Sequence, residues 1–274
     1  DGFSFSQATN ASEVTLNEME SAAGVSRRGR KMFNDSMAPA EWSFSTYVRP
    51  FLSTVDAVTS PTGLGWDGTS AQVHAVEEVL WAALVGTAAF TEGTASSNSS
   101  WADNVTNNTT SVPWDANTQP RLTVDFLGSN KSVVKELELY FVMGSGAYDA
   151  GTHQVYKLAK AVVNSATVDF DIDGIATINW SGFASSITDE GSQPTVTIKE
   201  GLSATNNFIR NRLTTLVVGA TAAENIVTAY TLTLTGGSVS FENNITYLTP
   251  DTIGEVNQPI GHVTGTRTIG GNFT

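Results

Sequence analysis

Residues 166–180, which read ATVDFDIDGIATINW, are the stretch that decides the fold class. Apolar and polar side chains alternate from Ala166 to Ile172 and again from Ile175 to Trp180, as they do in strands with one buried face. The pair Asp173-Gly174 separates the two runs, and Asp-Gly in that position is a strong signal for the tight turn of a β-hairpin. The stretch therefore predicts two antiparallel strands joined by a short turn.

Strand patterns continue on both sides of this hairpin. Trp42–Val48 alternates cleanly, and Arg49-Pro50 ends the run because proline has no amide hydrogen to give to a sheet. Ser12–Leu16 predicts a short strand, whereas residues 17–40 are polar and predict irregular structure. The other predicted strands are Leu122–Phe126, Leu137–Val142, Val155–Val163, Thr195–Lys199, Leu213–Val218, Ala229–Leu234, Ser238–Phe241 and Val263–Thr274.

One segment has the period of a helix. Val73, Val76, Leu80 and Leu84 recur at steps of three and four residues, which predicts a helix over Ser70–Val85 with an apolar stripe facing the core. Thr69 or Ser70 is suited to the N-cap and Gly86 to the C-terminal end. The fold class is therefore mainly β, a sandwich or barrel with one flanking helix at about residues 70–86. Trp42, Phe44, Trp81 and Trp180 are expected to anchor the core.

The strand series restarts near Asn207, which suggests two related units. The segment SATVDFD at residues 165–171 is echoed by GSVSFE at residues 237–242. We therefore expect duplicated modules, the first over residues 1–200 and the second over residues 201–274. Residues 91–118 are rich in Ser, Thr and Asn and predict a long surface loop in the first module.

The composition excludes several classes of protein. Of the 274 residues, 40% are hydrophobic, enough for a core, and 15% are charged, below the usual fraction of about 25%. The net charge of −13 argues against a DNA clamp, although repulsion suits a surface past which DNA must slide. The absence of cysteine excludes disulfides, thiolate metal sites and a cysteine nucleophile. No segment approaches the roughly 20 apolar residues of a membrane helix.

Catalytic and cofactor motifs are missing from the sequence. It contains neither a phosphate-binding glycine loop nor a Gly-x-Ser-x-Gly elbow, and His74, His153 and His262 have no metal-binding spacing. Asp169, Asp171 and Asp173 match the start of a calcium loop, but Trp180 occupies the twelfth position, where a bidentate Glu is required. We therefore expect no enzyme activity, no cofactor and no metal, and place the three aspartates on a solvated strand face leading into a turn.

Four of the fourteen basic residues, Arg27, Arg28, Arg30 and Lys31, are clustered. Such a segment could contact phosphate, but in an acidic protein a basic segment more often meets an acidic neighbour. These residues are our candidates for inter-subunit contacts.

Several segments in order resemble the tail tube proteins of long, flexible-tailed bacteriophages. The most specific are Glu41–Tyr47 and Asn243–Pro250. The supporting segments are Phe33–Ser36, Glu77–Leu84, Asp171–Gly174, Thr177–Gly182, Gly236-Gly237, Pro259–Gly261 and Thr264-Gly265. The resemblance covers about residues 26–274.

The resemblance implies a structural virion protein, made in the host cytoplasm, whose tube-type β-sandwich modules stack as rings around a DNA channel. It implies three two-module chains per ring rather than six single-module chains, contacts with other tail proteins such as the tape measure, and no specific binding of the DNA that passes through. Relatives have a further strand-rich segment after the part matching Val263–Thr274, so the second module is expected to be incomplete. Asp169, Asp171 and Asp173 are candidates for the lumen or its rim.

An extracellular β-sandwich adhesin or carbohydrate-binding protein is the alternative, because it would share the Thr- and Asn-rich strands. It would form discrete particles or fibres and bind sugar through exposed aromatic side chains. Hollow tubes or rings in negative-stain micrographs would distinguish the tail tube from this alternative.

Overall fold

A computed structural model describes residues 2–18, 27–54, 71–75, 77–86, 105–107, 109–110, 122–124, 126, 134–143, 154–191, 208, 210–211, 216–218, 230–251, 253 and 256–274. Within these ranges the chain forms 19 strands and one helix, which confirms the mainly β class. The predicted strand Thr195–Lys199 lies outside the described residues.

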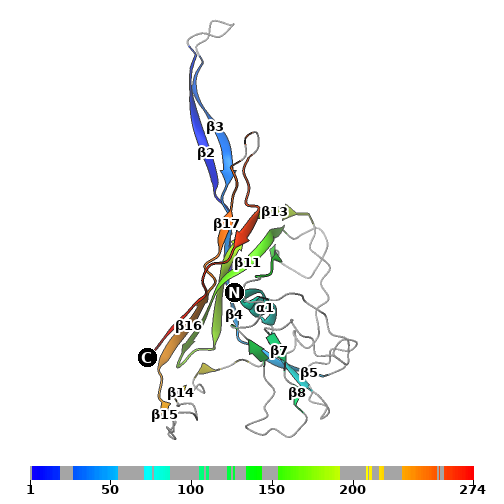
Figure 1. The fold of residues 1–274 in the computed structure, drawn as a ribbon, viewed down its shortest axis with the longest axis vertical. Helices are drawn as coiled ribbons and strands as arrows, with labels where there is room; N and C mark the ends of the chain where they lie inside the picture. The colour runs from blue at the N-terminus through cyan, green and yellow to red at the C-terminus, as the bar shows by residue number, and fades with distance from the viewer. Residues whose placement is uncertain are drawn as a thin grey trace.

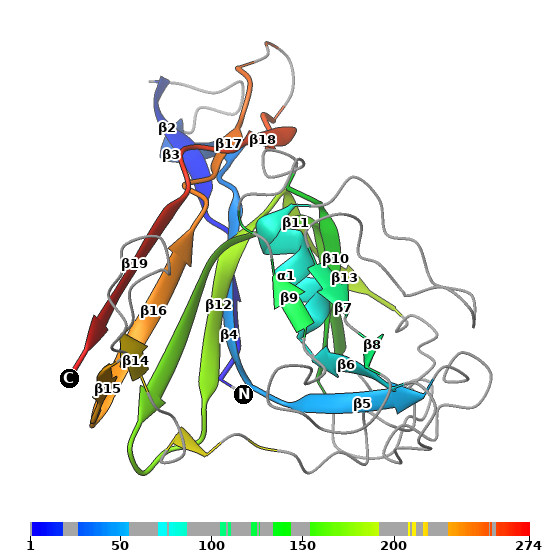
Figure 2. The same cartoon turned by 60° about the horizontal axis from the view of Figure 1, so that its bottom comes forward.

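The centre of the fold is an eight-stranded sheet that contains the predicted hairpin (Figures 1 and 2). Its main path runs β1-β4-β12-β11-β16-β19, and β10 and β13 pair with β11 beside that path. All of these pairings are antiparallel, and Asp169 of β11 lies opposite Thr177 of β12 across the predicted turn. The strands are β1 Ser4–Ser6, β4 Ala40–Tyr47, β10 Leu137–Met143, β11 Gln154–Asp171, β12 Thr177–Ala184, β13 Ser186–Glu190, β16 Gly236–Glu242 and β19 Thr268–Phe273.

Strand β11 connects two parts of this sheet. Its first half pairs with β10 and β13, and its second half pairs with β12 and β16. The change of partners coincides with a positive φ of 51° at Lys160 and with a register shift between Val163 and Ser165. Such bulges bend a strand and increase its twist. Two strands were predicted here, and the structure has one bent strand in their place.

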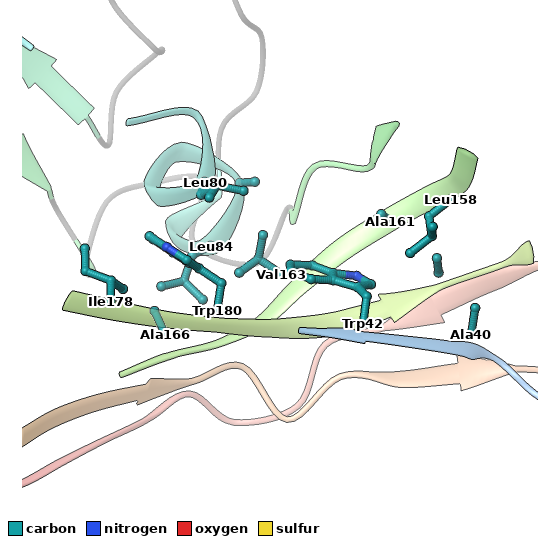
Figure 3. Close-up of a cluster of buried hydrophobic side chains, with 12 residues drawn as sticks. Ala40, Trp42, Leu80, Leu84, Leu158, Ala161, Val163, Ala166, Ile178 and Trp180 are labelled. Carbon is teal, nitrogen blue, oxygen red and sulfur yellow. The ribbon is translucent and has the colours of Figure 1, made fainter. Parts of the chain in front are cut away.

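Helix α1, Glu78–Val85, covers one face of the sheet (Figure 2). The core between them contains Trp42, Leu84, Ile178 and Trp180, each at most 2% exposed (Figure 3). The Trp81 and Trp180 rings meet edge to face with centroids 5.0 Å apart. Trp81 and Phe44 are partly buried against the same cluster, which confirms the predicted aromatic anchors.

The predicted start of the helix was wrong. Ala71–Ala75 forms strand β6, which pairs with β5, Pro50–Thr54, and the N-cap of α1 is Glu77. The ladder with β5 supplies β6 with tertiary hydrogen bonds, which override a helical pattern that local sequence alone suggests. Gly86 is at the predicted C-terminal end, where its φ of 92° suits a glycine.

Strands β2, Thr9–Glu18, and β3, Arg27–Met37, form a long hairpin that projects from one end of the sheet (Figure 1). The expectation of irregular structure over residues 17–40 was therefore wrong at 17–18 and 27–37, while residues 19–26 lie outside the described residues. Described side chains of the hairpin are mostly exposed on both faces, so the sequence lacks the alternation that marks a half-buried strand. The hairpin is anchored at its base, where Met37 donates its backbone N–H to the carbonyl of Asn257 at 2.8 Å.

The remaining strands form small sheets around the helix and the sheet ends. Part of the predicted 91–118 loop is strand, and the rest lies outside the described residues. These pairs are β6 with β8 Thr109–Thr110, β7 Val105–Asn107 with β9 Leu122–Val124, β14 Leu216–Val218 with β15 Tyr230–Leu232, and β17 Thr246–Leu248 with β18 Gly261–Val263.

The two predicted modules meet within the eight-stranded sheet. Val168 of β11 lies directly opposite Val239 of β16, so the two segments that echo each other in the sequence are neighbours in one ladder. Strands β16 and β19, from the predicted second module, continue the sheet beyond β11.

Candidate functional site

Around Trp180 the sheet has one apolar and one polar face, because side chains alternate along each strand. In β12, Ile178 and Trp180 point into the core, whereas Asn179 is exposed on the opposite face. Register extends this division to β4 and β11: Phe44 and Ala166 lie beside Trp180, and Ser45 and Thr167 lie beside Asn179. We call the side opposite the helix the polar face.

Polar side chains form rows across the strands of this face. One row runs through Ser4, Ser43, Ser181, Ser165, Glu242 and Thr268; the next through Ser45, Asn179, Thr167, Ser240 and Gly270; the third through Tyr47, Thr177, Asp169, Ser238 and Asn272. The rows contain hydroxyl, amide and carboxylate groups, and Tyr47 supplies their one aromatic ring.

Many of these groups hydrogen-bond to one another across neighbouring strands. The Ser165 and Ser181 hydroxyl oxygens are 2.7 Å apart, and those of Ser4 and Ser43 are 2.9 Å apart. The Ser238 hydroxyl donates to Asn272 Oδ1 at 2.8 Å. Cross-strand pairs of this kind stabilise a sheet and satisfy polar groups without an external ligand. Part of the polar face is therefore satisfied by hydrogen bonds within the sheet.

The charge on the polar face has one sign. Glu242 and Asp169 lie in the rows, Glu41 lies opposite Ser6 on the same face, and none of the three rows contains Lys or Arg. At neutral pH a polyanion in front of this face would meet carboxylates and neutral dipoles, and would be repelled. The cationic groups that phosphate binding requires are missing from these rows.

The three aspartates singled out in the sequence occupy one edge of this face. Asp169 accepts a hydrogen bond from Asn179 Nδ2 in the neighbouring strand. Asp171 ends β11, Asp173 lies in the turn to β12, and both are exposed. The structure thus places Asp169 on the polar face and the other two at its rim.

The position that would complete a calcium loop belongs to the core. Trp180 is 1% exposed on the opposite face of the sheet, and its indole N–H donates to Thr46 Oγ1 at 2.9 Å. Among the described residues, no group of three or more His, Cys, Asp or Glu side chains is arranged to hold a metal ion.

The four basic inter-subunit candidates lie in β3, in the outer part of the hairpin. Arg27 and Arg28 pair through their backbones with Glu18 and Asn17 of β2. Arg30 forms an exposed ion pair with Glu13 of the same hairpin, with Nε and Oε1 3.1 Å apart. The Lys31 ammonium lies 5.1 Å from the centre of the Phe33 ring. Arg30 thus has a partner within its own chain, which sequence reasoning did not anticipate.

Sequence reasoning also missed a polar clamp that fixes the end of α1 to Asn243 and Arg267, beside strands β16 and β19. Arg267 donates to the carbonyls of Leu84, Val85 and Phe126 at 2.9–3.2 Å, and to Asn243 Oδ1 at 2.8 Å. The buried Asn243 in turn donates Nδ2 to the Leu84 carbonyl at 2.8 Å. A cation at a helix C-terminus is favourable, because the last carbonyls of a helix lack intrahelical partners. Burial lowers the pKa of the Arg267 guanidinium.

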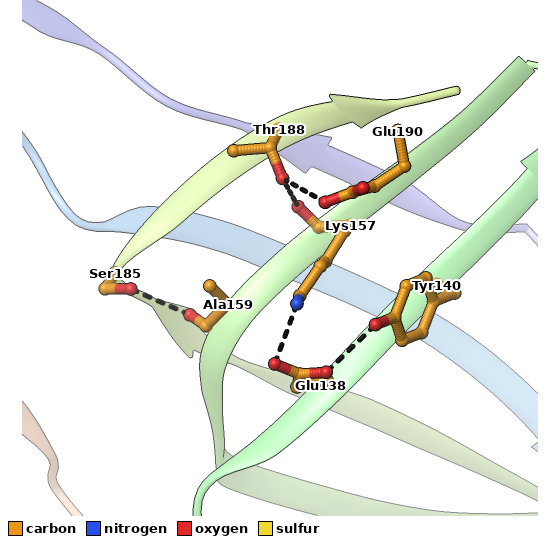
Figure 4. Close-up of polar contacts among 7 residues, drawn as sticks. All are labelled: Glu138, Tyr140, Lys157, Ala159, Ser185, Thr188 and Glu190. Atoms are coloured by element: carbon orange, nitrogen blue, oxygen red, sulfur yellow. Dashed lines mark hydrogen bonds and ion pairs between the residues drawn. The ribbon is translucent and has the colours of Figure 1, made fainter. Parts of the chain in front are cut away.

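A polar network lies outside the polar face, on the pair β10–β11 (Figure 4). Lys157 Nζ is 2.8 Å from Glu138 Oε1, and the Tyr140 hydroxyl donates to Glu138 Oε2 at 2.9 Å. The hydrogen bond from Lys157 lowers the pKa of Glu138, and the same contact raises the pKa of Lys157. Both charges are solvated, so the network contributes little to stability.

The described part of the chain contains no helix long and apolar enough to cross a membrane. No family model matches the sequence. The chain is similar to the tail tube protein pb6 of Escherichia phage T5, with 29% identity over 282 residues. The alignment covers 100% of this chain and 51% of that protein, so the chain spans about half the length of its curated relative. This similarity confirms the resemblance to phage tail tube proteins.

Proposed function

We propose that this chain is a structural subunit of a bacteriophage tail tube, which stacks as rings to form a hollow conduit for DNA ejection. The observation that carries the proposal is the similarity to a tail tube protein, because it extends over the entire chain. The mainly β fold agrees with this role. The adhesin alternative is not favoured, since the similarity is to a tube component.

The role is structural rather than enzymatic. Several groups of the polar face hydrogen-bond to one another, such as Ser165 with Ser181 and Ser238 with Asn272. It therefore resembles a solvated wall more than a site that awaits a substrate. The protein works in the virion, after synthesis in the host cytoplasm.

The polar face is our candidate for the lumen wall, with Asp169 on the wall and Asp171 and Asp173 at its rim. Its carboxylates would repel the phosphates of DNA and prevent adhesion during ejection. At physiological ionic strength this repulsion acts over about 8 Å, so it matters for DNA confined close to the wall. DNA would pass without specific binding.

We propose further that the ring is a trimer of two-module chains, with modules over residues 1–200 and 201–274. Support comes from the restarted strand series and from β16 and β19, which continue the sheet of the first module. A ring assembled by edge-to-edge pairing of sheets would close their exposed edges, which otherwise recruit further strands. Other tail proteins, such as the tape measure, would contact the finished tube.

Negative-stain microscopy of the purified chain tests the assembly. Hollow rings or stacked tubes are expected. Discrete particles across a range of protein and salt concentrations would refute the tube. In a reconstruction of such rings, six chains per ring, or two halves that do not superpose, would refute the duplicated trimer while leaving the tube intact.

A further inference from the structure

The strands of the central sheet break or bend along one line, which we call the sheet corner. On one side of it lie the wall strands β1, β4, β12, β16 and β19, and the chain continues on the other side as β2, β3, β13, β17 and β18 (Figure 1). Strand β11 crosses the corner unbroken but bent, with its positive φ at Lys160 and its register shift before Ser165. The breaks in the other strands fall at Gln7-Ala8, Ala38-Pro39, Ser185, Asn243–Ile245 and Thr264–Arg267.

On one side of β11, a glutamine side chain joins three of these breaks. The Gln7 amide donates Nε2 to the carbonyl of Ala38 at 2.9 Å and to that of Ser185 at 3.1 Å. Its Oε1 accepts the backbone N–H of Ile187, in β13, at 3.1 Å. Ser185 in turn donates its backbone N–H to the carbonyl of Ala159 in β11 at 2.9 Å. The break between β1 and β2 is thus tied to the breaks before β4 and before β13.

On the other side of β11, asparagine side chains join the remaining breaks. Asn243 donates its backbone N–H to the Asn164 carbonyl at 2.8 Å, and the N–H of Ile245 donates to Asn164 Oδ1, also at 2.8 Å. Asn244 has a left-handed φ of 49° and donates Nδ2 to the Thr266 carbonyl at 2.7 Å. A carboxamide side chain carries the donor and acceptor of a peptide group, so it can replace backbone pairing that a sheet loses where its strands bend.

We propose that Gln7, Asn164 and Asn244 are positioning residues, which hold the continuing strands at one fixed angle to the wall strands. Bulges and bends let strands turn such a corner, but they do not by themselves fix its angle. Water could satisfy the freed backbone groups over a range of angles, whereas a side chain bonded across the break satisfies them at one. The corner is therefore a brace rather than a hinge.

The angle matters for assembly, because the wall strands carry the polar face and the continuing strands project beyond it. This consequence rests on the proposed function: subunits with a variable corner should assemble less efficiently than subunits with a fixed one. The positioning role itself concerns the single subunit and can be measured without assembly.

Spin labels on unassembled subunits test the brace, because the chain has no native cysteine. The labels are attached to Val14→Cys in β2 and Asp173→Cys in the β11–β12 turn, two exposed positions on opposite sides of the corner. Double electron–electron resonance then gives the distribution of the distance between them, which should be narrow. Val14 lies roughly 20 Å from Ala8 along β2, so a change of about 10° in the angle moves it by about 3–4 Å.

Three separate variants remove the brace: Gln7→Met, Asn164→Leu, and Asn244→Gly, whose glycine accepts the left-handed φ. Each should broaden the distance distribution or shift its mean by about 3 Å. Asn164→Asp keeps the acceptor for the Ile245 N–H and should restore the wild-type distribution. The matched control is Asn272→Leu, which removes an amide oxygen that accepts the Ser238 N–H at 3.0 Å but lies in β19, away from the corner, and should change nothing.

Circular dichroism identifies the variants that fold, and three positions along the corner keep the test decisive if one of them does not. Wild-type distributions in the folded corner variants, or equal broadening in the Asn272→Leu control, would overturn the positioning role. Failure of the wild-type chain to assemble would overturn the proposed function instead, since the distance is measured in unassembled subunits.

Discussion

Replacing Arg267 with methionine should destabilise the folded subunit far more than the same replacement at Arg30. Arg267 makes four hydrogen bonds, three of them to backbone carbonyls at the end of α1 and at Phe126. Hydrogen bonds to a charged group contribute about 1.5–3 kcal/mol each when fully buried. Arg267 is only partly buried, and Asn243 still donates to the Leu84 carbonyl, so we expect a total loss of about 2–4 kcal/mol.

Arg30→Met is the matched control, because Arg30 makes an ion pair with Glu13 while its side chain remains 75% exposed. Such a pair contributes about 0–1 kcal/mol. The assay is urea unfolding of unassembled subunits, followed by circular dichroism, with a thermal melt in parallel. A loss of about 2–4 kcal/mol should lower Tm by about 5–12 °C for a domain of this size. Equal unfolding midpoints for the two variants would refute the account of the clamp.

The other predictions concern packing, assembly and metal binding. Gly182→Ala should prevent stable folding, since the alanine Cβ would lie 1.9 Å from the Val162 carbonyl oxygen. In the control variant Gly261→Ala the new Cβ meets no atom within 4 Å, so that variant should fold. Soluble yield and circular dichroism compare the two variants. Reversing the charges of Arg27, Arg28, Arg30 and Lys31 should shorten the tubes without unfolding the subunits. Raising the salt concentration should weaken the stacking of the wild-type chain. Equal assembly of the wild type at low and high salt, measured by light scattering, would contradict this prediction. Calorimetry should detect no stoichiometric calcium binding, because the loop position that requires a bidentate Glu is occupied by the buried Trp180. Tight calcium binding that is lost in the variant Asp169→Asn would overturn this prediction.

The sequence could predict those parts of the fold in which apolar and polar residues repeat at a regular spacing along one segment. The Asp173-Gly174 turn and the alternation around Trp42 and Trp180 identify half-buried strands, because every second residue faces the core. Of the hairpin β2–β3, only Ser12–Leu16 within β2 was predicted as a strand. The rest was missed because both faces of the hairpin meet solvent and the pattern has no apolar side. The first half of the predicted helix was wrong because pairing with β5 is a tertiary effect that the spacing of Val73 and Val76 does not encode.

The candidate site was predictable only in part. Asp169 was identified from its own hairpin, but the polar rows also contain Ser43 and Ser240, which are far from it in sequence. Their common face depends on the strand order, which local pattern cannot supply. The same holds for Arg267, whose partners on α1 are 182 and 183 residues away.

The most direct test of the central claim is a cryo-EM reconstruction of the assembled chain. We expect stacked hollow rings of three chains, with the face that carries Ser181, Asn179 and Asp169 turned toward the lumen and α1 on the outer side of the sheet. A solid fibre, a monomer, or a tube whose lumen is lined by another surface would contradict the account.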